Sequence, residues 1–167
     1  MAEVRQIREE DAAALLQLQH QLDGETQFMM LEPGERTTTE AEMQERIRSG
    51  LASGQELLWV AEDEGQLVGY VAAERGAFRR NRHVAHLVIG VAQSHAGQGL
   101  GARLFGAMEA WARQAGVRRL ELTVMAHNRA GLSLYTKLGF LVEGLKRRSL
   151  CVDGAWVDEY YMGKLLD

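Results

Sequence analysis

The stretch Gln98-Gly99-Leu100-Gly101 separates two segments of different character and decides the fold of this chain. Residues 83–91 are typical of a buried strand, and residues 102–115 have the apolar spacing of an amphipathic helix. A strand that enters a helix through glycines exposes the first N–H groups of the helix, where the helix dipole favours an anion. The turn therefore predicts a phosphate-binding site, with an ordinary strand-to-helix turn as the alternative.

The composition excludes several classes of partner. The chain has 167 residues, 46% of them hydrophobic and 25% charged, and a formal net charge of −4, which argues against nucleic-acid binding driven by bulk charge. The one cysteine, Cys151, allows no intramolecular disulfide; we read it as an inert thiol in a cytoplasmic setting. The charged N-terminal residues and the lack of an apolar run near the required length of about 20 predict neither a signal peptide nor a membrane partner.

The periodicity along the chain predicts an α/β fold with a mixed central sheet and about four helices. We expect helices at residues 9–22, 39–51, 102–115 and 128–138. We expect strands at residues 4–7, 57–61, 67–73, 83–91, 119–125, 140–145, 148–152 and 156–165. Because no linker or repeat interrupts this order, residues 1–167 are predicted to form a single domain. We also expect no metal site.

A second motif, from Asn128 to Phe140, follows the glycine turn after one intervening strand and contains a Leu134-Tyr135 pair before Gly139-Phe140. This motif and the stretch 91–101 resemble the two signatures of the GNAT acetyltransferase superfamily, and the predicted order of elements resembles that family along nearly the whole chain. The closing residues 143–162 are similar to a bacterial subgroup that acts on small amines, amino acids or protein N-termini. The resemblance implies a GNAT-like fold.

The resemblance also implies an acetyl-CoA-dependent N-acetyltransferase, in which a primary amine of a small molecule, amino acid or peptide attacks the thioester directly. The strand at 83–91 would splay from the strand at 119–125 so that the pantetheine arm enters the gap like an added strand. A backbone N–H near the end of the first strand would stabilise the developing oxyanion. The cofactor-binding residues implied are Ile89, Gly90, Val91, Gly97, Gln98, Gly99, Leu100, Gly101 and Asn128; the last also fits a plain helix N-cap.

The chain departs from the family at Ala96, where the resemblance leads one to expect Arg or Gln. The side-chain contact from that position is missing, so backbone amides must do most of the pyrophosphate binding. Arg103 is a nearby basic residue that would compensate.

Three residues are candidates for the proton transfers. The resemblance implies Tyr135 as general acid, or as a hydrogen-bond donor to the departing thiolate; the alternative is a core tyrosine on an amphipathic helix. His86 and Glu121 are the candidate general bases, acting directly or through a held water. The alternatives are a core or interface histidine and a glutamate on a solvated strand face. A free α-amine, with a pKa of about 8, needs little help from a base.

Two further segments bear on the substrates. The apolar cluster 28–31, which contains Phe28 and Met29, lies where the family places its acceptor pocket and predicts an acceptor with an apolar group; packing on the core or at a homodimer contact is the alternative. The basic run 79–82 fits an acidic substrate, the CoA 3′-phosphate or a solvated hairpin tip. A non-catalytic acyl-CoA-binding regulatory domain is the rival function. The absence of a Gly-Lys-Ser/Thr after the glycines argues against a P-loop nucleotide site.

Overall fold

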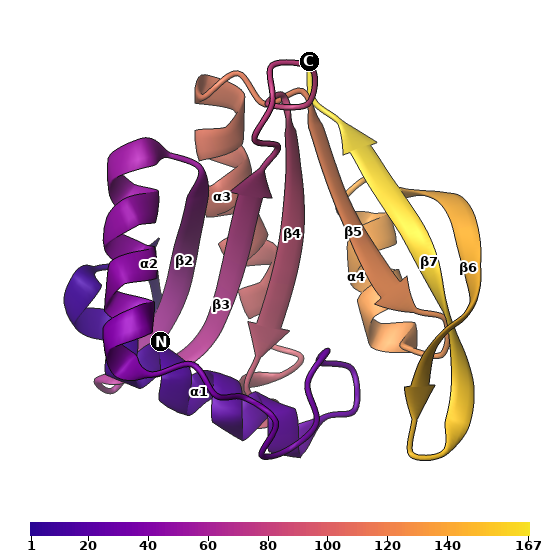
Figure 1. Ribbon diagram of the computed structural model, residues 1–167, viewed down its shortest axis with the longest axis horizontal. Coiled ribbons are helices and arrows are strands. Elements are labelled where there is room, and N and C mark those ends of the chain that lie inside the picture. Colours follow the sequence, from indigo (N-terminus) through magenta and orange to yellow (C-terminus); the bar gives the residue numbers. More distant parts are fainter.

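The computed structural model describes residues 1–167 as one seven-stranded mixed sheet with two helices on each face (Figure 1). In sheet order the strands are β1 (Glu3–Gln6), β2 (Glu56–Asp63), β3 (Gln66–Arg75), β4 (Val84–Val91), β5 (Arg119–Met125), β7 (Ala155–Leu165) and β6 (Leu141–Val152). The helices are α1 (Ala12–Glu25), α2 (Glu40–Ser53), α3 (Leu100–Gln114) and α4 (Arg129–Lys137), and short 3-10 turns occupy Glu9–Asp11 and Gln93–His95. The predicted α/β class, with a mixed sheet and four helices, is confirmed.

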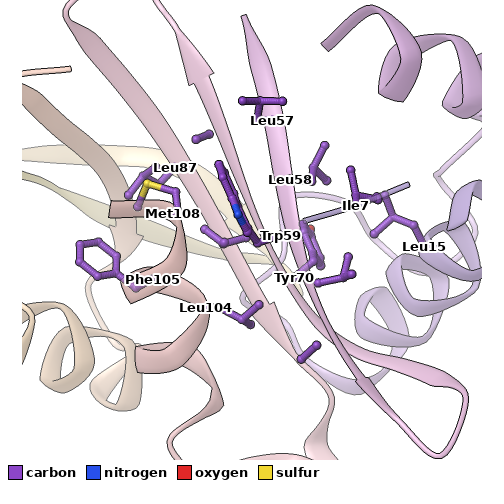
Figure 2. Close-up of a cluster of buried hydrophobic side chains, with 14 of the residues drawn as sticks. Ile7, Leu15, Leu57, Leu58, Trp59, Tyr70, Leu87, Leu104, Phe105 and Met108 are labelled. Carbon is purple, nitrogen blue, oxygen red and sulfur yellow. The ribbon is translucent and has the colours of Figure 1, made fainter. Parts of the chain in front are cut away.

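The core lies on both faces of the central strands. Residues 57–61 of β2 are all buried, which explains why this stretch is continuously apolar rather than alternating. On one face Trp59 packs against Trp111 of α3, with ring centroids 5.4 Å apart. Figure 2 shows Phe105 and Met108 of α3 on this side and Leu15 of α1 on the other. The helices thereby fix the strands that carry the predicted site.

The pairing of β4 with β5 ends early. These strands are parallel, and their ladder consists of three residue pairs, of which His86 with Glu121 is the last. β4 nevertheless continues to Val91 and β5 to Met125, while β4 stays paired to β3 along its whole length. Figure 1 shows the two strands separating toward their carboxyl ends. The predicted splay is confirmed, and we call this V-shaped opening the fork.

Two predicted boundaries were wrong. The strands expected at 140–145 and 148–152 are one strand, β6, interrupted by an irregularity between Lys146 and Leu150. Its cause is Arg148, whose φ of 49° turns the backbone so that its N–H donates to the Asp158 carboxylate at 2.7 Å. α1 ends at Glu25 rather than at residue 22, because Gly24 continues the helix instead of ending it. None of the helices is long and apolar enough to cross a membrane.

Candidate active site

The glycine turn at the end of β4 has the backbone geometry of an anion site. Gly97 and Gly99 have φ angles of +74° and +78°, a left-handed conformation that favours glycine, and a Cβ on either would face open space. Gly99 is the N-cap of α3 and offers no side-chain cap. The first N–H groups of α3 are therefore free of intrahelical partners and lie beside an open, exposed turn.

Two of the predicted cofactor-binding glycines sit in tight packing. A Cβ on Gly90 would lie 2.8 Å from Cδ1 of Leu22 in α1, and a Cβ on Gly101 would lie 3.0 Å from Cδ2 of Leu134 in α4. The absent side chains let α1 approach β4 and let α4 approach the start of α3. Both glycines thus bring neighbouring elements close to the fork, a role that the motif alone did not reveal.

The backbone of β4 presents free amides to the fork. The Val84 carbonyl and the Ala92 N–H both form hydrogen bonds on the β3 side. Because the backbone groups of successive residues in a strand point to alternate sides, those of Ile89 and Val91 point toward β5. These two residues lie beyond the last pair of the β4–β5 ladder. Of the three predicted cofactor-binding residues in β4, Ile89 and Val91 therefore present their backbone groups to the gap, whereas those of Gly90 point toward β3.

The segment between β4 and the glycine turn is held at two points. The Gln93 N–H donates to Oε2 of Glu25, the last residue of α1, at 2.9 Å. His95 Nε2 is 2.8 Å from Oδ2 of Asp63 at the end of β2, and this hydrogen bond lowers the pKa of Asp63. His95 therefore anchors the turn to the end of β2. These contacts hold the approach to the glycine turn in place.

Arg103, the residue predicted to compensate for Ala96, lies in the first turn of α3. Its side chain is exposed and forms no ion pair or hydrogen bond within the protein. Ala96 itself follows the 3-10 turn and donates its N–H to the Gln93 carbonyl. The first turn of α3 thus carries both N–H groups without intrahelical partners and an unpaired guanidinium.

Tyr135 and Asn128 belong to α4. Tyr135 packs against Phe140, with ring centroids 6.0 Å apart, and burial raises its pKa to about 12. The phenol therefore stays protonated throughout the physiological pH range, as a hydrogen-bond donor requires. Asn128 is the N-cap: its Oδ1 accepts the Gly131 N–H at 3.0 Å. The capping role considered for Asn128 is confirmed, and Gly131 makes room for it, since a Cβ there would lie 2.6 Å from Asn128 Nδ2.

His86 and Glu121 meet at the apex of the fork. They form the last ladder pair, and together they line a cleft of about 290 Å³ with Glu74, Arg75, Gly76, Asn81 and Val84. His86 is exposed, so the alternative of a core histidine is wrong. Glu121 accepts a hydrogen bond from Arg119 Nε at 3.1 Å. His86 lies three residues before Ile89 in β4, which at about 3.3 Å per residue is a distance of roughly 10 Å. The imidazole is therefore too far away to take a proton directly from a group bound beside Ile89.

A larger cavity, of about 360 Å³, opens at the other end of the fork. Its walls are the end of α1 with the following loop, the end of β5, and the β6–β7 hairpin. The lining residues are Asp23, Gly24, Glu25, Thr26, Gln27, Met29, Met30, Leu31, Glu32, Pro33, Met125, Leu150, Cys151, Val152 and Asp153. We call it the acceptor cavity. Because Glu25 binds Gln93 just past β4 and Met125 ends β5, the cavity spans the open ends of both strands.

Three residues of the apolar cluster 28–31 line this cavity and the fourth does not. Met29, Met30 and Leu31 line it, but Phe28 does not; its ring packs on His127 with centroids 5.0 Å apart. The closing strands on either side of Asp153 were predicted, but neither their place in this lining nor the lining carboxylates were recognised in the sequence. Asp23 and Glu25 were missed because α1 was predicted to end before them. Cys151, read as an inert thiol, is exposed in this lining.

The basic run 79–82 lies at the opposite end of β4 from the glycine turn. It precedes β4, whereas the glycines follow it, and eight strand residues separate the two by about 26 Å. Its residues belong to the exposed turn between β3 and β4, where Arg75 donates to the Arg82 carbonyl at 2.9 Å. A solvated hairpin tip therefore accounts for these arginines, and they do not reach the glycine turn.

Comparisons with known proteins agree with this arrangement. The model of the "Acetyltransferase (GNAT) family" matches residues 18–140. L-amino acid N-acetyltransferase AaaT of Escherichia coli is 32% identical over 106 residues, which cover 61% of this chain and 64% of that protein. N-alpha-acetyltransferase RimI of Mycobacterium tuberculosis is 40% identical over 103 residues, covering 61% of each chain. The matched region is thus less than two thirds of either relative.

The solved structures match along the whole length. A GNAT-family acetyltransferase from Streptococcus pneumoniae superposes with a TM-score of 0.95 and 31% identity, covering 99% of this chain and 100% of that one. The protein yncA of Salmonella typhimurium, solved with acetyl-CoA, has the same fold: its TM-score is 0.88 at 23% identity, with 100% of this chain and 95% of that one covered. Together with the forked strands and the glycine turn, the match to the family model shows that this chain belongs to the GNAT acetyltransferase family.

Proposed function

We propose that the chain is an acetyl-CoA-dependent N-acetyltransferase that acetylates a primary amine of a small molecule, amino acid or peptide N-terminus. The observation that carries this proposal is the fork. It opens between β4 and β5 after His86 and Glu121, with the glycine turn and the acceptor cavity both at its open end. Acetyl-CoA held on the glycine turn and an amine held in the acceptor cavity would meet between β4 and β5.

The residues around the fork fit acetyl-CoA. The amides at the start of α3, from Leu100 onward, suit a pyrophosphate, and Arg103 adds a free positive charge. Ile89 and Val91 offer backbone groups to an extended pantetheine arm, as a strand edge does to an added strand. When bound, acetyl-CoA supplies a thioester that an unprotonated amine can attack.

The N–H groups of Ile89 and Val91 would act on the carbonyl oxygen. A fixed backbone dipole in a dry gap stabilises negative charge as it develops, by about 3–4 kcal/mol for one such donor in other enzymes. Tyr135 would donate its hydroxyl hydrogen to the sulfur. With its pKa at about 12, against about 8.5 for an ordinary thiol, the phenol stabilises the leaving thiolate chiefly through a hydrogen bond rather than by complete transfer of its proton.

His86, supported by Glu121, is our candidate for the general base. Its side chain lies at the apex of the fork, in a cleft with room for water. Since His86 lies roughly 10 Å along the strand from Ile89, the proton of the attacking amine would reach it through a chain of waters. An amine that is already unprotonated at neutral pH would depend little on this path.

The experiment that tests the proposal follows release of the CoA thiol from acetyl-CoA over a panel of amino acids, polyamines, aminoglycosides and peptides, with mass spectrometry of the products. Release that depends on an amine, together with an acetylated product, supports the enzyme. Stable binding of acetyl-CoA without acetylation of any amine supports the alternative, a non-catalytic acyl-CoA-binding domain. The two results are mutually exclusive.

A further inference from the structure

We propose that the acceptor cavity selects amines whose neighbouring carbon carries no carboxylate, so that amides and peptide N-termini are acetylated in preference to free amino acids. The inference rests on the proposed function, because it concerns the acceptor of that reaction. It follows from the charges of the lining, from the positions of the nearby cations and from the apolar surface beside them.

The lining of the acceptor cavity carries charge of one sign only. Among its 15 residues are four carboxylates and no lysine, arginine or histidine. The carboxylates come from three separate segments: Asp23 and Glu25 from α1, Glu32 from the loop after it, and Asp153 from the β6–β7 hairpin. An ammonium group entering the cavity is attracted from several sides, whereas a carboxylate finds no positive partner.

Only one of these carboxylates is neutralised by an ion pair. Arg36 donates to both oxygens of Asp23, at 2.9 and 3.0 Å. This guanidinium is itself largely buried, so it is committed to Asp23. Glu25 accepts hydrogen bonds from neutral groups alone, the side-chain amide of Gln21 and the backbone N–H of Gln93, so no cation is paired with its carboxylate.

Glu32 and Asp153 form no ion pair and come from different segments of the lining, the loop after α1 and the β6–β7 hairpin. The basic residues of the adjacent strand β6 do not correct this imbalance. Lys146 lies 3.6 Å from the buried carboxylate of Glu159, and neither Arg147 nor Arg148 belongs to the lining. Three carboxylates of the lining, those of Glu25, Glu32 and Asp153, therefore have no ion-pair partner within the protein.

A free amino acid cannot present its amine without its carboxylate, because both groups are bonded to the same carbon. The carboxylate would enter the cavity with the amine and meet charges of its own sign. An amide at that position removes the repulsion and leaves the side chain unchanged. Met29, Met125 and Leu150 offer apolar surface for such a side chain, and a methionine-like group matches their flexible surface.

The test compares L-methioninamide with L-methionine as acceptors, two molecules with the same side chain. The value of kcat/KM is expressed per concentration of unprotonated amine, because the amide group also lowers the pKa of the amine. We expect the amide to be preferred by at least about 10-fold. In the double variant Glu32→Gln/Asp153→Asn the ratio should fall severalfold because methionine improves, while Glu64→Gln, a matched change at the exposed β2–β3 turn, should leave it unchanged.

Three outcomes would count against the inference. Equal or faster acetylation of methionine by the unaltered protein would overturn the selectivity and leave the proposed function standing. An unchanged ratio in the double variant, with its fold verified by circular dichroism, would overturn the role of these carboxylates. Acetylation of neither amine, nor of any other amine in the panel, would overturn the proposed function itself.

Discussion

His86 of β4 and Glu121 of β5 form the last pair of the parallel ladder, and beyond them both strands continue without pairing to each other. This pair fixes where the sheet opens. It also separates two regions of the fork: a polar cleft where β4 and β5 are still paired, and the acceptor cavity where the two strands have separated. The chemistry proposed for the chain depends on the backbone groups that become free between these two regions.

The first prediction concerns the glycine turn. Acetyl-CoA should raise the Tm of the unaltered protein, since a ligand that binds only the native state stabilises it. Gly99→Glu should abolish this shift by placing a negative side chain among the amides that would hold the pyrophosphate. Differential scanning fluorimetry with and without acetyl-CoA measures the effect.

Gly54→Glu is the matched control for this variant. Gly54 ends α2 with a φ of +70° and open space around it, so the same side chain meets the same backbone strain away from the turn. Both variants should lose about 1–2 kcal/mol of stability from the left-handed conformation. The Gly54→Glu variant should keep the shift caused by acetyl-CoA, and an equal shift in Gly99→Glu would show that the anchor lies elsewhere.

The second prediction concerns the hydroxyl of Tyr135. Tyr135→Phe keeps the ring that packs against Phe140 and removes only the donor, so kcat should fall by about 10²–10⁴-fold. The Kd of acetyl-CoA from calorimetry should change little. An unchanged kcat would leave Tyr135 as a packing residue of α4.

The raised pKa of Tyr135 adds a pH dependence to this prediction. Because burial raises the pKa of Tyr135 to about 12, its hydroxyl remains protonated at every pH well below that value. Ionisation of this hydroxyl should therefore not limit kcat in an assay between pH 6 and about 10. An alkaline decline of kcat near pH 10 that disappears in Tyr135→Phe would contradict the burial of the phenol.

The third prediction concerns the proton path. His86→Gln should lower kcat/KM by about 10–100-fold near pH 7 for an α-amine acceptor, and by much less at pH 9. The base is dispensable once the amine, with a pKa of about 8, is already unprotonated. His83→Gln, an exposed change just before β4, serves as the control. Equal losses at both pH values would argue for a structural role of His86.

The fourth prediction concerns the apolar part of the acceptor cavity. Burial of apolar surface contributes roughly 25 cal/mol per Å², so phenylalanine- or methionine-like amines should exceed spermidine and aminoglycosides in kcat/KM. Met29→Asp should penalise those apolar acceptors selectively, whereas Phe78→Asp, at an exposed position between β3 and β4, should not. A preference for spermidine, or indifference to Met29→Asp, would contradict the assignment.

The sequence predicted the order of the elements because its periodicity and its turn residues point to the same fold. The glycine turn between a strand and a helix was also recognisable, since the glycines supply the positive φ angles that the turn needs. The continuity of β6 through Arg148 was not, because a non-glycine residue with positive φ inside one strand gives the same local pattern as a break between two strands. The end of α1 was missed because Gly24 suggests a stop that the tertiary structure overrides.

The candidate site was only partly predictable, because local sequence patterns do not connect residues that are far apart in the chain. Tyr135, Asn128 and the glycines carry motif-like spacing, and the sequence places them near one another. The acceptor cavity joins residues more than 100 positions apart, such as Glu25 and Asp153, which no local pattern connects. The anchoring of the turn by Asp63 and His95 is equally a product of the folded sheet.

The most direct test of the central claim is mass spectrometry of an amine incubated with the protein and acetyl-CoA labelled with ¹³C in its acetyl group. L-Methioninamide is the acceptor of choice. The account predicts that the amine gains the labelled acetyl group one for one with the CoA thiol released, and that Tyr135→Phe slows both to the same extent. Binding of acetyl-CoA without transfer of the label to this or any other amine would contradict it.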